Sequence, residues 1–294
     1  MGSDPIFSEA GMVGYFAMSG RFSRSWALIK YSTAVLKKDS ELLIFPLFSS
    51  IAAIFIFASF VPLFIEPPEA EQDTYYLAVL GGLYLAEYFV IIFFNSALVG
   101  AAMIRMQGGN PGIGDGLRIA WSRFWQILGY AMIAATVGLL LRAIGQRLGF
   151  IGRIFAGLSG IAWTVTTFLV VPVLVSRDIG PVDAIRESAV LLKKTWGENL
   201  ISSAGLGLIF YLIYLLLFGL VMFTAYTAFG AGNTELATGI AIVGVLVAIL
   251  VGLFQAALQG IISAALYRYA TDGQSSAGIS TESLNHAFAP KNGV

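Results

Sequence analysis

Four polar side chains inside otherwise apolar runs are the first candidates for chemistry. Glu87 is the one acidic residue in the interior of such a run, and Asn95, Gln255 and Gln259 are amides in similar surroundings. A carboxylate in hydrocarbon commonly serves an ion or proton path, or it pairs with a cation. Amides in such runs line a polar path or hold helices together at about 1 kcal/mol each. We favour packing for the amides. Glu87 stays open between a transport role, a place nearer the membrane interface and an ion pair with an arginine.

No constellation for catalysis stands out elsewhere. The chain has no cysteine, and its one histidine, His286, lies in a polar tail. This excludes thiolate metal sites and a Cys nucleophile, and it leaves no His-dependent triad in the apolar runs. The glycine-rich stretch 108–112 lacks the lysine and Ser/Thr of a phosphate loop, so it indicates a helix break. We therefore predict no catalytic, cofactor-binding or metal-ligating residues, no cofactor and no enzymatic activity.

Composition indicates what kind of protein holds these residues. The 294 residues are 57% hydrophobic and only 12% charged, whereas soluble domains carry about 25% charged residues. The apolar runs are long enough to cross a bilayer, which takes roughly 20 residues. The net charge is zero, so no overall field attracts nucleic acid. The predicted fold class is all-α: a polytopic membrane protein with about six transmembrane helices in three pseudo-repeats, each made of one interfacial amphipathic helix and two spans.

Breaks between the apolar runs divide the chain. We expect a flexible lead at 1–19 without a cleaved signal peptide, repeat unit 1 at 20–110, repeat unit 2 at 111–179, repeat unit 3 at 180–270, and a polar tail at 271–294. The predicted amphipathic helices are 20–38, 113–124 and 181–196. The predicted spans are 41–65, 74–107, 125–141, 155–176, 200–229 and 236–270. The run 74–107 is too long for one crossing, so its end should tilt or project into water.

Two internal matches favour duplication. Residues 29–38 (IKYSTAVLKK) match 185–194 (IRESAVLLKK), and residues 94–100 (FNSALVG) match 254–260 (FQAALQG) at nearly the same offset. Both pairs occur in the same order along the chain. Because each unit has two spans, all units keep one orientation in the membrane, which makes the repeats parallel.

Basic residues are distributed unevenly over this topology. With the amphipathic stretches in the cytoplasm, every Lys and Arg lies on the cytoplasmic side except Arg142, Arg147 and Arg153. The loop 66–73 on the other side has four carboxylates and no cation. The positive-inside rule then predicts a multi-pass protein of the prokaryotic cytoplasmic (inner) membrane with both termini in the cytoplasm. The three hairpin arginines either reach the outer headgroups, or the hairpin 125–176 is re-entrant.

The amphipathic stretches have the features of helices that lie flat at a membrane interface, as a collar around the spans. Trp26, Trp121 and Trp196 are the predicted interfacial anchors. Four lysines are candidates for contact with anionic lipid headgroups, with plain topology signalling as the alternative: Lys37, Lys38, Lys193 and Lys194. The apolar stripes are Phe22, Trp26, Ile29, Thr33 and Leu36; then Ile113, Leu117, Trp121, Phe124 and Leu128; then Val182, Ile185, Ala189, Leu192 and Trp196.

Four short stretches stand out beside Gly180, Pro181 and Ser188: 21–26 (RFSRSW), 42–47 (LLIFPL), 167–174 (TFLVVPVL) and 194–199 (KTWGEN). With these residues the chain resembles an uncharacterised prokaryotic family of six-span integral membrane proteins. The resemblance covers roughly residues 20 to 290. The chain is also distantly similar to the membrane domain found beside glycerophosphodiester phosphodiesterases, in which a basic helix precedes each pair of spans. The resemblance implies an architecture, and it implies no activity or catalytic residues.

These features favour a non-enzymatic membrane scaffold that organises lipid or binds a partner. The alternative is a transporter or channel for a small or amphiphilic solute, using Glu87 and nearby polar residues. Convergence of the four polar side chains around a wet cavity would favour transport, and their scattering into dry packing would favour the scaffold. The expected partners are membrane lipids, anionic in character, and a second copy of the chain or another membrane protein. Nucleic acid is not an expected partner.

Overall fold

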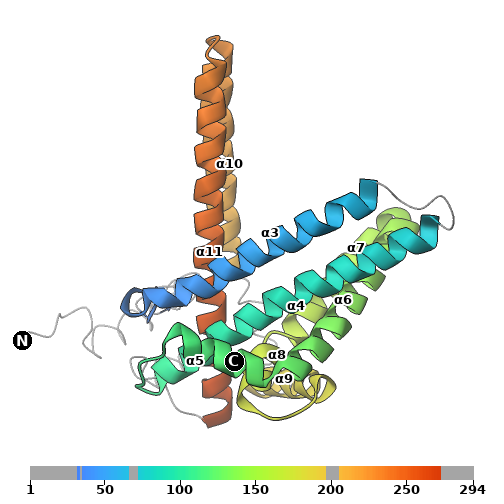
Figure 1. The fold of residues 1–294 in the computed structure, drawn as a ribbon, viewed down its shortest axis with the longest axis vertical. Helices are drawn as coiled ribbons and strands as arrows, with labels where there is room; N and C mark the ends of the chain where they lie inside the picture. Colours follow the sequence, from blue (N-terminus) through green and yellow to red (C-terminus); the bar gives the residue numbers. More distant parts are fainter. Residues whose placement is uncertain (1–31, 34, 66–71, 197–204, 273–294) are drawn as a thin grey trace, which may run out of the picture. The chain divides into compact units, whose positions relative to one another are not determined.

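The fold is known from a computed structural model, which describes residues 32–33, 35–65, 72–196 and 205–272 (Figure 1). All regular structure in these ranges is helical. A 3-10 turn at Ser40–Leu43 precedes α3, and the α-helices are α3 (Ile44–Ile65), α4 (Gln72–Met106), α5 (Ile113–Ser122), α6 (Phe124–Arg147), α7 (Gly149–Thr166), α8 (Val170–Ser176), α9 (Pro181–Trp196), α10 (Gly205–Gly230) and α11 (Thr234–Asp272). Residues 32–33 and 35–38 are also helical.

Six helical segments are long and apolar enough to cross a membrane, which confirms the predicted fold class. They are Ser40–Ile65, Thr74–Met106, Phe124–Arg147, Gly149–Ser176, Ile209–Gly230 and Thr234–Arg268. The third extends beyond the predicted end at 141, because Arg142 and Arg147 lie on the helix rather than in a loop. The turn comes instead at Gly149, whose φ of 59° lies in the left-handed region that glycine adopts without strain.

The described residues form two compact units. The first, called the core unit here, holds Asp39–Thr195 and the end of α11 from Gly260 onward. The second, called the hairpin unit, consists mainly of α10 and of α11 up to Gln259. In the hairpin unit the two helices approach closely at two glycines: a Cβ on Gly244 would lie 2.6 Å from Val221, and one on Gly252 would lie 3.3 Å from the Tyr214 hydroxyl.

The core unit is packed most densely at one end of its spans. Helix α4 lies at its centre and contacts α3, α5, α6 and α8. Residues with no more than 1% exposure gather at this packed end: Phe45, Ala97, Leu98, Val99, Ala101, Ala102, Val170, Val173, Leu174, Ile261 and Ala264. Toward the other end, large apolar side chains such as Ile54 and Phe55 are 66% and 71% exposed. Exposed apolar surface of this kind is what a lipid-facing span presents.

The fourth span is broken, which differs from the single span predicted at 155–176. Helix α7 ends at Thr166, residues 167–169 form a turn, and α8 begins at Val170. Pro172 explains the break, because proline lacks an N–H and its ring crowds the carbonyl four residues earlier. Within α8 the proline occupies the first turn, where the missing N–H is tolerated. The break leaves backbone groups that need partners inside a buried region.

Candidate functional site

Helix α5 docks on the packed end through small residues. Gly116 and Ala120, one turn apart, are its buried positions. A Cβ on Gly116 would lie 2.6 Å from the carbonyl oxygen of Ala97 and 2.6 Å from the Phe45 ring. Across the same interface, a Cβ on Gly100 would lie 3.0 Å from Ile119. The face of α5 that packs on protein is therefore the one with the smallest side chains.

Helix α9 follows the same design. Its buried residues are Ala184, Ser188, Leu191 and Leu192, while Val182 is 59% exposed. On α5 and α9 most residues of the predicted apolar stripes are thus not buried, with Leu192 as an exception. On α5, Trp121 is 69% exposed. Small residues thus occupy much of the packing face of each helix, whereas Trp121 and Val182 stay exposed.

Ser188 of α9 fills the gap in the fourth span. Its hydroxyl donates to the Thr166 carbonyl at 2.6 Å and accepts the Leu169 N–H at 3.1 Å. Ser188 is fully buried, and Leu169 is 2% exposed. One side chain thus supplies partners for two backbone groups at the break, where buried polar groups need them. This contact fixes α9 to the turn between α7 and α8.

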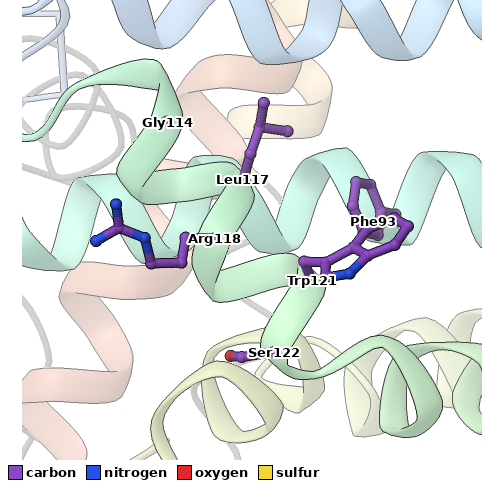
Figure 2. Close-up of a pocket in the computed structure, with 6 residues that line it drawn as sticks. All are labelled: Phe93, Gly114, Leu117, Arg118, Trp121 and Ser122. Atoms are coloured by element: carbon purple, nitrogen blue, oxygen red, sulfur yellow. The ribbon is translucent and has the colours of Figure 1, made fainter.

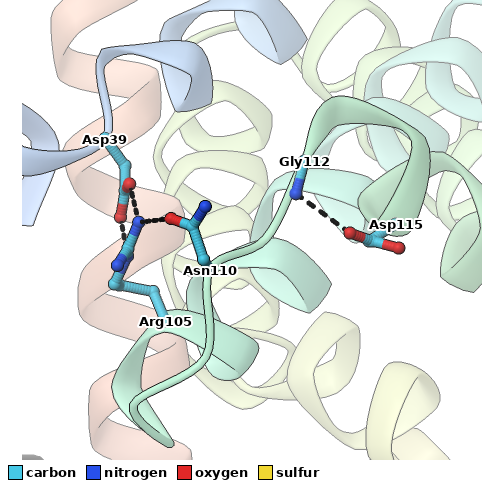
Figure 3. A network of polar contacts seen from close by, with 5 residues as sticks. All are labelled: Asp39, Arg105, Asn110, Gly112 and Asp115. Carbon is cyan, nitrogen blue, oxygen red and sulfur yellow. Dashed lines mark hydrogen bonds and ion pairs between the residues drawn. The ribbon is translucent and has the colours of Figure 1, made fainter.

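An ion pair holds the end of α4. Arg105 donates to both carboxylate oxygens of Asp39, and its side chain also reaches the Asn110 oxygen at 2.6 Å (Figure 3). The side chains of Arg105 and Asp39 are 16% and 10% exposed. A carboxylate and a guanidinium in two parallel hydrogen bonds form one of the stronger polar contacts in proteins. The pair joins the entry of the first span to the exit of the second.

Two further arginines tie the loop between α8 and α9 to its neighbours. Arg123 pairs with Asp178, which also accepts from Gln126 at 3.0 Å. Arg177 donates to Glu187 at 2.9 Å. A hydrogen bond with the Tyr267 side chain, reinforced by Glu187, raises the pKa of Arg177. Arg177 therefore stays charged at any physiological pH and links the loop to α9 and to the end of α11.

The predicted lipid-facing lysines behave differently from these arginines. Lys37, Lys38 and Lys193 are exposed, and within the described ranges none of them takes part in an ion pair. Lys194 lies on α9, and its side chain falls outside the described part, as do the side chains of Trp26 and Trp196. Trp121 is joined at the surface by Trp125, which is 76% exposed. The basic residues thus divide into a paired set and an unpaired set.

The four polar intramembrane candidates occupy separate surroundings. Glu87 is partly buried on α4, and no described cation lies within ion-pair distance of it. Asn95 lies at the crossing of α4 with the end of α11, where its Oδ1 would be 3.2 Å from a Cβ on Gly260. Gln255 and Gln259 lie one turn apart on α11, the first partly buried and the second exposed. Their roles stay predictions.

Sequence reasoning missed the contacts that hold the packed end together. Two features of the sequence pointed to the Ser188 hydrogen bonds: Pro172 interrupts a predicted span, and Ser188 matches Ser32 in the internal repeat. No sequence signal pointed to the Asp39–Arg105 ion pair, because the two residues are 66 positions apart. Trp125 was visible beside Trp121 as a second tryptophan at the start of a span.

Six helices that are long and apolar enough to cross a membrane define the class: a polytopic α-helical membrane protein. A family model described as a family of unknown function, DUF6159, matches residues 74–277, and the chain belongs to that family. A comparison with curated proteins found no match. The family match confirms the prediction of an uncharacterised family. It gives no support to the likeness with the membrane domain beside glycerophosphodiester phosphodiesterases, which stays a prediction.

Proposed function

We propose that this protein is a non-enzymatic membrane scaffold that organises anionic lipid around its packed end. The observation that carries the proposal is the division of the cations. Arg105 is paired with Asp39, Arg123 with Asp178 and Arg177 with Glu187. Lys37, Lys38 and Lys193 are exposed, and none of them takes part in a described ion pair. Exposed lysines without an acidic partner suit anionic headgroups, at about 1 kcal/mol for each lysine near the surface.

The packing supports a fixed role better than a moving one. Interfaces built on glycine, alanine and serine allow close backbone approach, and such contacts hold membrane helices together by dispersion and hydrogen bonding. Gly116 and Gly100 give such an interface between α5 and its neighbours, and Ser188 gives one for α9. A second copy of the chain or another membrane protein is the partner we propose for such a scaffold.

Duplication forms part of the proposal, and matched burial supports it. In the first internal match Ser32 and Ser188 are both fully buried, and so are their neighbours Leu36 and Leu192 at 3% and 6% exposure. In the second match Ala97 and Leu98 correspond to Ala257 and Leu258, and all four are at most 1% exposed. Matching residues that also match in burial are what a repeated structural unit produces.

The proposed orientation places the packed end in the cytoplasm of a prokaryote. The arginines that disagree with it, Arg142, Arg147 and Arg153, are exposed and lie within about two turns of Gly149. At the tip of a hairpin they reach outer headgroups by extending their side chains. This favours a hairpin that crosses the membrane over a re-entrant one.

Single cysteines test this orientation, since the chain has no cysteine of its own. In intact cells an impermeant thiol reagent should label Gln72→Cys and Asn233→Cys, and it should label Ser275→Cys only after the membrane is opened. Labelling of Ser275→Cys in intact cells would contradict the orientation and, with it, the contact between the lysines and cytoplasmic headgroups.

Replacing Lys37, Lys38, Lys193 and Lys194 together by Gln tests the lipid-organising function. The variant should retain about a tenth or less of the anionic lipid that the native protein carries through purification, because four favourable charge contacts are removed. Native mass spectrometry at low ionic strength measures this, since salt screens the interaction. The control is Arg147→Gln with Arg153→Gln, which removes cations from the other end of the spans. Equal lipid content in all three proteins would overturn the proposal.

The alternative function, transport of a small or amphiphilic solute, has one supporting observation. Polar side chains line part of the interface between α4 and α6: the Tyr84 hydroxyl accepts from Arg142 at 3.1 Å, and the Tyr88 hydroxyl would be 3.1 Å from a Cβ on Gly138. Glu87 lies between these two tyrosines in the sequence. The hollow over α5 is lined by none of these side chains, and the ion-paired arginines and exposed lysines are the stronger observation, so the scaffold is the function we favour.

A further inference from the structure

An open hollow lies over the outer face of α5, away from its small-residue interface. Its volume is about 580 Å³, and its lining is almost entirely apolar. The lining residues are Phe93, Gly114, Leu117, Arg118, Trp121 and Ser122. Figure 2 shows Arg118 leaving the helix on one side of the hollow, with Trp121 and Phe93 on the other. The hollow thus has a cationic edge and an aromatic edge.

The position of the hollow along α4 sets its depth in the membrane. The second candidate span starts at Thr74, and Phe93 comes about 20 residues later, a rise of roughly 30 Å. This equals the thickness of the hydrocarbon core, which is about 30 Å. With Thr74 placed at the outer hydrocarbon boundary, Phe93 falls where acyl chains end and headgroups begin.

The aromatic edge is a fixed wall. The rings of Trp121 and Phe93 meet edge to face, with centroids 6.0 Å apart and planes at 90°. Phe124 supports Trp121 at 5.4 Å, and Phe94 contacts Phe93 at 5.6 Å. Trp121 keeps 69% of its surface exposed despite these contacts. A rigid apolar wall with a tryptophan at interface depth suits the upper part of an acyl chain.

The cationic edge has unused hydrogen-bonding capacity. The Arg118 side chain is 83% exposed, and the one acid near it, Asp115, is 3.9 Å away. The other Asp115 oxygen accepts the Gly112 N–H at 2.9 Å at the start of α5. Asp115 is therefore engaged in holding the helix start, and the exposed pair contributes little. A guanidinium left with open donors matches the geometry of a phosphate.

We propose that this hollow binds one anionic glycerophospholipid, with its phosphate at Arg118 and one acyl chain along Leu117, Trp121 and Phe93. The positive edge, the depth and the apolar wall together select a lipid rather than a soluble anion. The space beside Gly114 is open, since a Cβ there would meet nothing within 4 Å. The proposal rests on the lipid-organising function and gives that function a defined site, which is separate from Lys37, Lys38, Lys193 and Lys194.

The test uses the full-length protein in nanodiscs and phosphatidylglycerol with brominated acyl chains. Brominated chains quench tryptophans that they touch, and Trp121→Phe identifies which part of the quenching belongs to Trp121. Arg118→Gln should weaken phosphatidylglycerol binding about tenfold, the loss expected for a charged hydrogen bond. The matched control is Arg186→Gln: Arg186 is also exposed and also has an acid three residues earlier, Asp183. This control should bind like the native protein.

A second variant keeps the proposal falsifiable if the charge change acts indirectly. Gly114→Phe places a ring into open space and should displace the acyl chain, which removes the Trp121 quenching while the melting temperature stays near that of the native protein. Equal effects of Arg118→Gln and Arg186→Gln would overturn the site and leave the lipid-organising function standing. Brominated phosphatidylcholine that quenches Trp121 as strongly as brominated phosphatidylglycerol would also overturn the site. Loss of lipid in the four-lysine variant without any change in Trp121 quenching would support a site that does not depend on those four lysines.

Discussion

Ser188→Ala is expected to lower the free energy of unfolding by about 2–4 kcal/mol. The hydroxyl is the partner of both the Thr166 carbonyl and the Leu169 N–H at the break in the fourth span. Leaving a buried backbone group without a partner costs about 1–3 kcal/mol, and alanine leaves two. Unfolding of the purified protein by a denaturing detergent, followed by circular dichroism, measures the change.

Ser122→Ala is the matched control for this experiment. The Ser122 hydroxyl donates to the Ile119 carbonyl of its own helix at 2.7 Å, at an exposed position. Water takes over such a contact, so the change in unfolding free energy should stay within about 0.5 kcal/mol. If the two serine variants lose equal stability, the hydroxyl of Ser188 does not hold the break together. The attachment of α9 would then depend on its apolar contacts alone.

The spans could be predicted from sequence because their determinants are local. Length and hydropathy identify a crossing without reference to partners, and all six candidate spans lie where apolar runs predict them. The broken fourth span could not be predicted in the same way. Pro172 is compatible with a kinked helix or with a full break, and the break is stabilised by Ser188 from another helix.

The site was predictable only as a list of residue types. A count of cations treats Arg105 and Lys193 alike, and it is the fold that pairs Arg105 with Asp39 and leaves Lys193 exposed. The packing faces were hidden for a related reason. Periodicity of large apolar residues identifies the side of a helix that avoids water, and at a membrane interface that side can face lipid. Trp121 lies on such a side, while Gly116 and Ala120 form the protein contact.

Gly116→Ala is expected to destabilise the protein by about 2–3 kcal/mol, or to prevent its accumulation in the membrane, although it adds one methyl group. The new Cβ would lie 2.6 Å from the Ala97 carbonyl oxygen and 2.6 Å from the Phe45 ring. The first contact is with the backbone of α4, and the Phe45 side chain is 1% exposed, so neither group can move aside cheaply. Overpacking of this kind costs about 1–3 kcal/mol.

Gly114→Ala on the same helix meets nothing within 4 Å. It should be neutral, or it should stabilise by up to about 1 kcal/mol because alanine is the better helix former. The melting temperatures of the two variants in detergent should therefore move in opposite directions or differ by several degrees. Equal shifts would mean that α5 is not held against α4 and α3 by its small-residue face.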